Sequence, residues 1–124
     1  MEGITFDTGA LIALERRHAR IAKVLAIATA EDLRITVPSV VLAEWWRGPS
    51  KLRAHILAAV DVEPVDGELA KAAGEALAAV RSATIVDAIV MASAARRGDV
   101  VYTSDFGDLD RLRQHFPAVR VLRV

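Results

Sequence analysis

The sequence contains no cysteine among its 124 residues. This absence excludes disulfide bonds, thiolate zinc centres, iron–sulfur centres and a cysteine nucleophile. No apolar run is long enough to span a bilayer, and the first ten residues, MEGITFDTGA, lack the basic flank and apolar segment of a signal peptide. We therefore expect a cytoplasmic protein with no membrane association.

An excess of charge of one sign is also missing, because sixteen basic residues balance sixteen acidic ones. Domains that bind nucleic acid by bulk electrostatics alone are usually strongly basic, so the sequence argues against that class. A local basic rim around an acidic site stays compatible with this balance. A near-neutral chain also has little net charge to oppose self-association.

The sequence does contain the composition of a globular domain. Hydrophobic residues make up 53% and charged residues 26% of the chain. A chain of this length can fold around one core without disulfide bonds or structural metals. We expect residues 1–124 to form a single domain without repeats or linkers. Short apolar segments alternate with segments of helical periodicity, and proline and glycine fall between them.

This alternation predicts a parallel α/β sheet with right-handed crossovers and helices on both faces. We expect strands over residues 3–6, 34–37, 62–65, 100–103 and 119–124. We expect helices over residues 9–16, 18–31, 39–46, 51–60, 84–96 and 108–115, and one after Asp66 with an apolar stripe from Leu69 to Val80. Ser39 and Asp66 are candidate N-caps.

Four acidic residues stand where an ordinary helix or strand would not favour them. Asp7 directly follows the first strand and Asp105 follows the strand over residues 100–103, so both lie at carboxyl ends of parallel strands. Ligand sites of open parallel sheets lie at that edge. Glu44 and Asp87 lie within almost wholly apolar helices, where burying a carboxylate is costly.

Each of these acids also has a purely structural explanation. Asp7 and Asp105 are possible N-caps of the helices that follow them. Asp87 is placed to cap its helix or complement the helix dipole, and Glu44 lies three residues before Arg47, a spacing that allows an ion pair. For any one acid alone the structural explanation is the commoner one, and the joint pattern favours a shared site.

Two further acids follow Asp105 by about one helical turn. Asp108 and Asp110 lie three residues before Arg111 and Arg113, so either could pair on a solvated face or join the site. Clustered carboxylates repel one another and need cations, and oxygen ligands of this kind suit Mg²⁺ or Mn²⁺. Phosphodiester cleavage is the reaction that such a site fits best.

Four segments, in order, resemble PIN-domain ribonucleases and specifically the VapC toxins of VapBC toxin–antitoxin modules. The segments are ITFDTGALIAL (4–14), VPSVVLAEWWRG (37–48), IVDAIVMASAARRG (85–98) and VVYTSDFGDL (100–109). The resemblance implies that the catalytic, metal-binding acids are Asp7, Glu44, Asp87 and Asp105. It implies a further metal ligand at Asp108, ahead of Asp110, and places Thr103 at the threonine position of the family.

The same resemblance implies a three-layer α/β/α PIN fold around a parallel sheet. It further implies an Mg²⁺-dependent endoribonuclease, with Mn²⁺ as a substitute, that acts on RNA as a toxin, forms a homodimer and is neutralised by a cognate VapB-type antitoxin. One departure is the pair Phe106–Gly107, which replaces the polar residues often found after the fourth acid.

Other functions stay open at this point. A housekeeping RNA-processing nuclease would use the same site. A receiver-like signalling domain would need paired acids after the first strand and a lysine near the last, whereas Asp7 is followed by Thr8 and Gly9, and no lysine follows Lys71. A haloacid-dehalogenase-like phosphatase needs the motif D-x-D, and Gly9 stands at its third position.

Two further groups of residues stand out. Trp45 and Trp46 point about 100° apart on one helix, so we expect one in the core and the other at an interface. Arg47, Lys51 and Arg53 are a candidate basic flank for RNA phosphates, although a solvated face is the simpler interpretation. The three histidines share no metal-ligand spacing. Arg96 and Arg97, at the end of a predicted helix, are placed to complement its dipole.

Overall fold

In the computed structural model, which describes residues 3–124, the chain folds into a parallel sheet with helices on both faces. The strands are β1 (Ile4–Phe6), β2 (Ile35–Pro38), β3 (Asp61–Glu63), β4 (Val100–Thr103) and β5 (Arg120–Arg123). The helices are α1 (Thr8–Glu15), α2 (Ala19–Ala30), α3 (Ser39–Trp45), α4 (Lys51–Ala58), α5 (Gly67–Ala79), α6 (Ile85–Arg97) and α7 (Phe106–Leu112). Within the described residues, the order of elements is the one that the sequence predicts.

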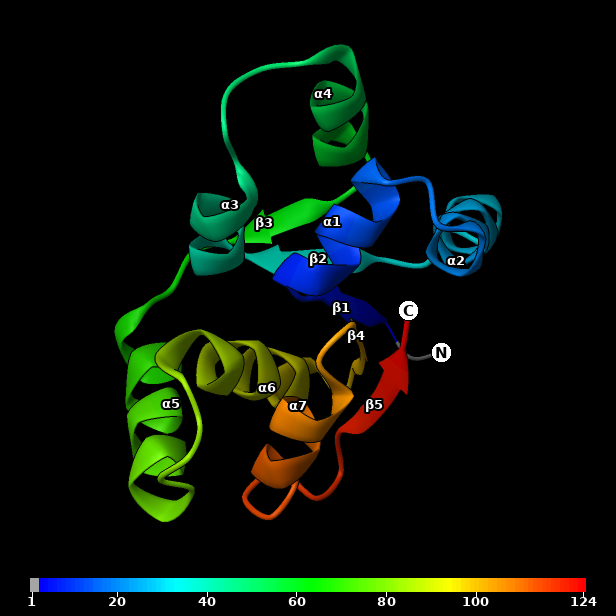
Figure 1. Ribbon diagram of the computed structural model, residues 1–124. Helices are drawn as coiled ribbons and strands as arrows, with labels where there is room; N and C mark the ends of the chain where they lie inside the picture. The colour runs from blue at the N-terminus through cyan, green and yellow to red at the C-terminus, as the bar shows by residue number, and fades with distance from the viewer. Residues whose placement is uncertain (1–2) are drawn as a thin grey trace.

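The sheet has the order β3-β2-β1-β4-β5, and every neighbouring pair of strands is parallel. The chain builds outward from β1 to β3 and then crosses back to place β4 on the other side of β1. Figure 1 shows α1, α2 and α4 on one face of the sheet and α5, α6 and α7 on the other. This confirms the three-layer α/β/α architecture, and it places the topological switch point between β1 and β4.

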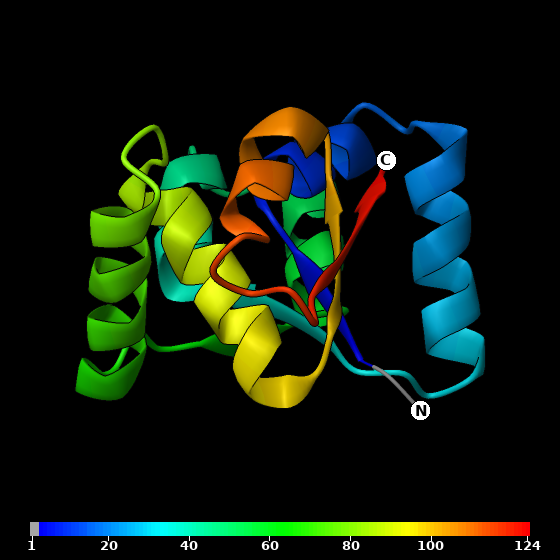
Figure 2. The same ribbon diagram turned by 90° about the horizontal axis from the view of Figure 1, so that it is seen from below.

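Helix α6 is the central helix of its layer. Residues 88–94 are all buried, as expected of a helix that is apolar nearly all the way round. Gly98 ends the helix in the left-handed conformation, with φ of 73°, which a residue without Cβ adopts at little cost. Figure 2 shows α6 crossing beneath the sheet, with α5 and α2 at opposite ends of the molecule.

A buried polar network joins the C-terminal end of α6 to the sheet, and we call it the Arg97 network. Its members are Thr5, Glu63, Ser93, Arg97 and Asp99. The Arg97 guanidinium donates to Glu63, to Asp99 at 2.9 Å, to Thr5 at 3.0 Å and to Ser93 at 2.8 Å. Arg97 lies in the last turn of α6, as the dipole interpretation expects, and it also pairs with the carboxylates of Glu63 and Asp99.

Neighbouring Arg96 is more exposed and pairs with Glu63 at 3.2 Å and with Asp66 at 3.1 Å. Asp66 is also the predicted N-cap of α5, where its carboxylate accepts the backbone N–H of Leu69. Ser39 is not an N-cap: Pro38 holds that position with extended backbone, and Ser39 is already helical.

Most element boundaries differ from the prediction by one or two residues, and those of α7 and β3 have a clear reason. Helix α7 begins at Phe106 and ends at Leu112, because Leu109 and Leu112 are its buried anchors. Strand β3 covers Asp61–Glu63, the residues that pair in register with β2.

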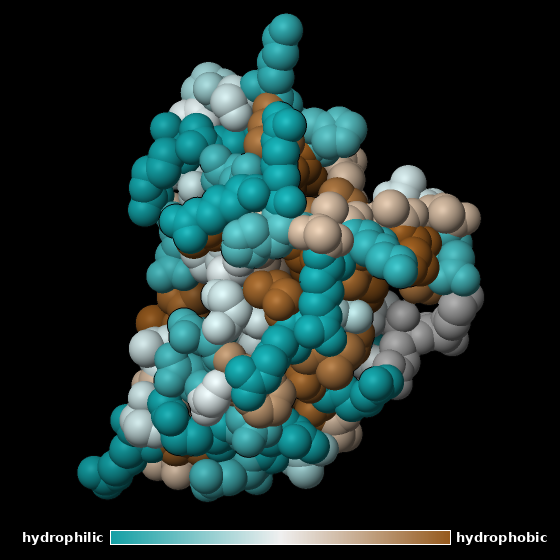
Figure 3. Space-filling view, turned by 45° about the vertical axis from the view of Figure 1, so that its right-hand side comes forward, coloured by the Kyte–Doolittle hydropathy of each residue, from teal (hydrophilic) through white to brown (hydrophobic). Residues whose placement is uncertain are grey.

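One side of the molecule carries apolar surface. Figure 3 shows hydrophobic atoms between charged side chains on the side that carries α2 and β5. There a hollow of about 210 Å³ lies between α2 and the sheet, lined in part by Val24, Ile27 and Tyr102. Across residues 3–124, none of the helices combines the length and apolar character that crossing a membrane requires.

Candidate active site

Carboxylates gather in a pocket at the carboxyl ends of β1 and β4, at the switch point of the sheet. The cavity has a volume of about 210 Å³, and we call it the acidic pocket. Its lining residues are Asp7, Thr8, Gly9, Glu44, Thr84, Val86, Asp87, Asp105 and Asp108. All five acids named as metal ligands from the sequence therefore line one cavity.

Asp7 lies deepest in this pocket and is 5% exposed. One carboxylate oxygen accepts the backbone N–H of Ala10 at 2.9 Å, so Asp7 does cap α1, and the other accepts the hydroxyl of Thr103 at 2.5 Å. Burial raises the pKa of Asp7 to about 6, although these two hydrogen bonds act in the opposite direction. The charges of Asp87 and Asp105 add to the increase.

Asp105 is linked to Asp7 through Thr103. The Thr103 hydroxyl accepts the backbone N–H of Asp105 at 2.8 Å while it donates to Asp7. Asp105 occupies the N-cap position of α7, but its side chain makes no capping hydrogen bond. The structural explanation of Asp105 as a side-chain cap is therefore wrong, and its carboxylate is left for the pocket.

Glu44 reaches the pocket from α3. It accepts the hydroxyl of Thr8 at 2.6 Å, which joins α3 to the start of α1. Arg47 does not pair with Glu44, because its guanidinium donates to the backbone carbonyls of Ala43 and Trp46. The i,i+3 ion pair considered from the sequence is therefore absent.

Asp87 lies in the first turn of α6 and is half-buried. Thr84 caps the helix by accepting the backbone N–H of Asp87, so the Asp87 carboxylate is not the cap. Burial raises the pKa of Asp87, and the charges of Asp108, Asp105 and Glu44 raise it further.

The structure distinguishes the two acids of α7. Asp108 lines the pocket and pairs at its rim with Arg111 at 2.5 Å. Asp110 pairs with Arg113 at 3.1 Å and is not among the pocket residues.

Gly9 brings two acid-bearing segments together and was not identified from the sequence as part of the site. A Cβ at Gly9 would lie 1.9 Å from the Ser104 hydroxyl oxygen and 2.9 Å from its Cβ. Only glycine allows the start of α1 to approach the segment after β4 so closely. A glycine in the first turn of a helix, where alanine would be more stable, is the one signal that the sequence offered.

The donor set suits a hard divalent cation. Carboxylate and hydroxyl oxygens line the pocket, and the match to Mg²⁺ or Mn²⁺ is one of donor type and charge. Within residues 3–124, no three acidic or histidine side chains already converge into a metal-binding group. Mutual repulsion of the carboxylates opposes such convergence when no cation is bound.

The sheet and its acidic switch point define an acid-lined, three-layer α/β domain. The sequence identifies the family, because residues 4–114 match the PIN domain. The chain therefore belongs to the PIN-domain family, whose members are generally nucleases and usually use divalent metal ions. This assignment makes the receiver-like and dehalogenase-like alternatives wrong.

Solved structures with the same fold include three toxin–antitoxin assemblies. A DNA-bound VapBC from Salmonella typhimurium is 19% identical with a TM-score of 0.75, and the match covers 99% of this chain and 98% of that one. VapBC2 from Rickettsia felis, bound to a promoter DNA fragment, is 13% identical with a TM-score of 0.76 and 98% coverage of both chains. A toxin–antitoxin complex from Klebsiella pneumoniae is 17% identical with a TM-score of 0.73, covering 97% of this chain and 96% of that one. No curated protein matches this sequence closely enough to be counted as a relative.

Proposed function

We propose that this chain is a VapC-type toxin, a metal-dependent endoribonuclease that hydrolyses RNA phosphodiester bonds. The acidic pocket carries this proposal, because it gathers five carboxylates at the switch point of a PIN-domain sheet. The only ion pair there, among the described residues, joins Asp108 to Arg111 at the rim. The repulsion within such a cluster would be offset by a bound divalent cation, which would in turn bind a phosphate.

Asp7, Glu44, Asp87 and Asp105 would hold Mg²⁺ or Mn²⁺ as the catalytic set, with Asp108 as a further ligand. When bound, the divalent cation would neutralise charge on the phosphodiester and lower the pKa of an attacking water. The chain's own hydroxyl groups orient the ligands. Thr103 fixes one oxygen of Asp7, and Thr8 fixes one oxygen of Glu44.

The toxin role is supported by the shared fold with the VapBC assemblies. We propose that a cognate VapB-type antitoxin neutralises this chain in the cytoplasm by placing a basic side chain in the acidic pocket. A cation is what the clustered carboxylates lack, and a basic side chain supplies one. We propose a homodimer as the state of the toxin.

The test of the enzyme is cleavage of single-stranded RNA by the purified chain. Cleavage should require Mg²⁺ or Mn²⁺, stop with EDTA and return when metal is added back in excess. Equal cleavage without metal would contradict the proposal. For the toxin role, expression of the chain should arrest growth and co-expression of the product of the neighbouring gene should relieve the arrest. A housekeeping nuclease would cause no arrest.

A further inference from the structure

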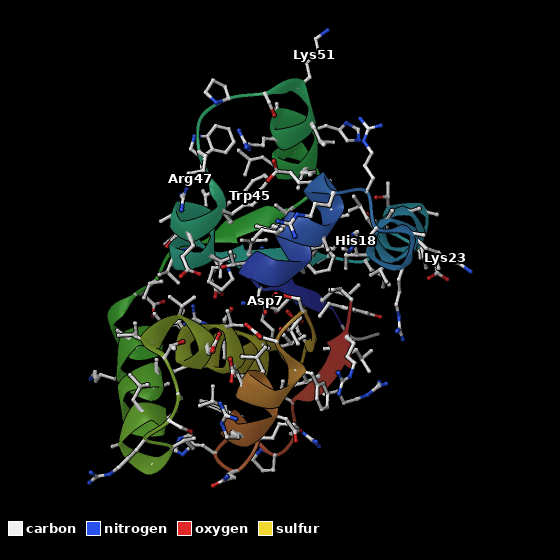
Figure 4. The ribbon with its side chains drawn as sticks, in the orientation of Figure 1. Asp7, His18, Lys23, Trp45, Arg47 and Lys51 are labelled. Carbon is white, nitrogen blue, oxygen red and sulfur yellow. The ribbon has the colours of Figure 1, made fainter. Side chains whose placement is uncertain are left out.

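A second cavity adjoins the acidic pocket, and we call it the basic cleft. It has a volume of about 350 Å³. Its lining residues are Ile12, Glu15, Arg16, Glu44, Trp45, Arg47 and Arg53. Glu44 lines both cavities, so the basic cleft begins where the acidic pocket ends. In Figure 4, Trp45 and Arg47 lie on the α3 side above Asp7.

The basic cleft carries more positive than negative charge, because three arginines line it against the two acids Glu15 and Glu44. Both carboxylate oxygens of Glu15 are engaged, one by the indole N–H of Trp45 at 2.7 Å and the other by Arg53 at 3.1 Å. Glu44 accepts the hydroxyl of Thr8. Of the three arginines that line the cleft, only Arg53 is therefore paired with a carboxylate within residues 3–124.

The other two arginines are available to an anion. The guanidinium of Arg16 has no hydrogen bond or ion pair to any residue that the structure describes, and Arg16 is exposed at the end of α1. Arg47 donates only to backbone carbonyls in the described chain, which leaves its charge uncompensated. Lys51, the third member of the predicted basic flank, points away into solvent in Figure 4.

We propose that the basic cleft binds a backbone phosphate of the RNA next to the phosphate that is cleaved. This inference rests on the proposed function and specifies how that site holds its substrate. Guanidinium groups match phosphate oxygens in charge and in hydrogen-bond geometry. A strand that leaves the acidic pocket past Glu44 meets Arg16 and Arg47 next, and their charge offsets the repulsion between the strand and the acids.

The cleft recognises phosphate and not a base. Trp45 is only 4% exposed, so its ring offers no open face for stacking. Trp46 is half-buried, stands edge-on to Trp45 at 6.0 Å and is not among the lining residues. Trp45 is therefore the core tryptophan that the sequence predicts, and binding at the cleft should be independent of base sequence.

The test compares two RNA substrates with the same central step, a dinucleotide with one phosphate and a hexanucleotide. The variants are Arg16→Gln, Arg47→Gln and their combination. Lys23→Gln is the control for bulk charge, because Lys23 points into solvent from α2 (Figure 4). The combined variant should lower kcat/KM for the hexanucleotide by at least about tenfold and leave the dinucleotide within about twofold. Lys23→Gln should leave both substrates unchanged.

A binding measurement accompanies the kinetics. A non-cleavable 2′-O-methyl hexanucleotide should bind the combined variant more weakly than the native chain. The slope of log affinity against log salt should fall by about 0.7 for each RNA phosphate that the variant no longer neutralises. Weaker binding together with absent cleavage by the native chain would support the cleft and contradict the proposed function.

Three results would overturn the cleft. One is native cleavage and binding in the combined variant, and another is the same loss on both substrates. The third is unchanged RNA kinetics with a loss of antitoxin binding, which would assign the arginines to a carboxylate of a protein partner. Unfolding curves and Mn²⁺ affinity of each variant should match those of the native chain, and a variant that fails this check is replaced by another neutral substitution, Arg16→Met or Arg47→Met.

Discussion

Carboxylates gather at both ends of α6, and one of them is buried at each end, but the electrostatic surroundings of the two clusters are opposite. At the C-terminal end, burial acts to raise the pKa of Glu63, yet hydrogen bonds from Ser93 and Arg97 outweigh it and the pKa is lowered. At the N-terminal end, burial raises the pKa of Asp7 to about 6, and no arginine of residues 3–124 forms an ion pair with it. Exposure does not distinguish them, because Asp7 is 5% exposed and Asp99, in the Arg97 network, is 6% exposed. The cluster at the C-terminal end is paired with arginines and joins α6 to the sheet. The acidic pocket has one ion pair among the described residues, at its rim, and is suited to an external cation.

The largest expected effect comes from removing one charge from the acidic pocket. Asp87→Asn should lower RNA cleavage by at least about a thousandfold, because it removes a charged group from the reacting site. The metal-free variant should be as stable as the native chain or more stable, because the swap opens no cavity and relieves repulsion. Saturating Mg²⁺ should reduce or reverse that gain, since only the native chain keeps all of the proposed metal ligands.

Thermal melts with and without Mg²⁺, beside one cleavage assay, check both parts. Near-native cleavage by Asp87→Asn would remove Asp87 from the site.

Breaking the other end of α6 should affect stability and not chemistry. Arg97→Met should lower the free energy of unfolding by about 3 kcal/mol, because it leaves the carboxylates of Glu63 and Asp99 with less compensation. Arg96→Met is the matched control, and its more exposed pair should cost less than about 1 kcal/mol. Urea unfolding measures both. Cleavage at a temperature where each variant is folded should be near native, and an equal cost for the two variants would contradict the comparison.

The pH dependence of stability should reveal the uncompensated burial of Asp7. Its folded-state pKa of about 6 lies above its usual value of 3.8, so the folded state binds the proton more tightly. The metal-free native chain should therefore lose stability as pH rises from about 4 to about 6, by up to about 3 kcal/mol. Asp7→Asn should lack this loss. Urea unfolding in EDTA at several pH values checks it, and parallel pH curves for the two proteins would show that Asp7 carries no such penalty.

The smallest effect concerns the orientation of Glu44. Thr8→Val removes the hydroxyl that donates to Glu44 and should lower Mn²⁺ affinity and kcat/KM by about tenfold, the usual cost of losing a group that orients a ligand. Thr8→Ser keeps a hydroxyl and should recover most of the loss. If Thr8→Ser is as poor as Thr8→Val, the methyl group and not the hydrogen bond matters.

Much of this arrangement follows from the sequence. Hydrophobic periodicity predicts the order of the strands and helices, and the strand-end rule places Asp7 and Asp105 at one edge of the sheet. An apolar setting marks Glu44 and Asp87 as unusual. These signals are local or follow from the topology, so a single amino-acid sequence contains them.

Contacts between distant segments could not be predicted in this way. Asp108 and Asp110 have the same local pattern, an arginine three residues later, and only the start of α7 at Phe106 decides which one lines the pocket. Arg97 looks like an ordinary helix-end cation until the fold brings Glu63 and Thr5 beside it. Sequence separation hides such partners, because periodicity carries no information about which faces meet.

The close approach of Gly9 to Ser104 determines the stage at which the repulsion between Asp7 and Asp105 is overcome. Because backbone packing holds the segments that carry Asp7 and Asp105 together, the repulsion between their charges is overcome once, as the chain folds. In the proposed enzyme, a cation that binds later would meet acid-bearing segments whose backbones are already in place, and its binding energy would remain available for drawing in the side chains and the substrate. The absence of a side chain at Gly9 thus lets the cost of bringing these two segments together be met during folding.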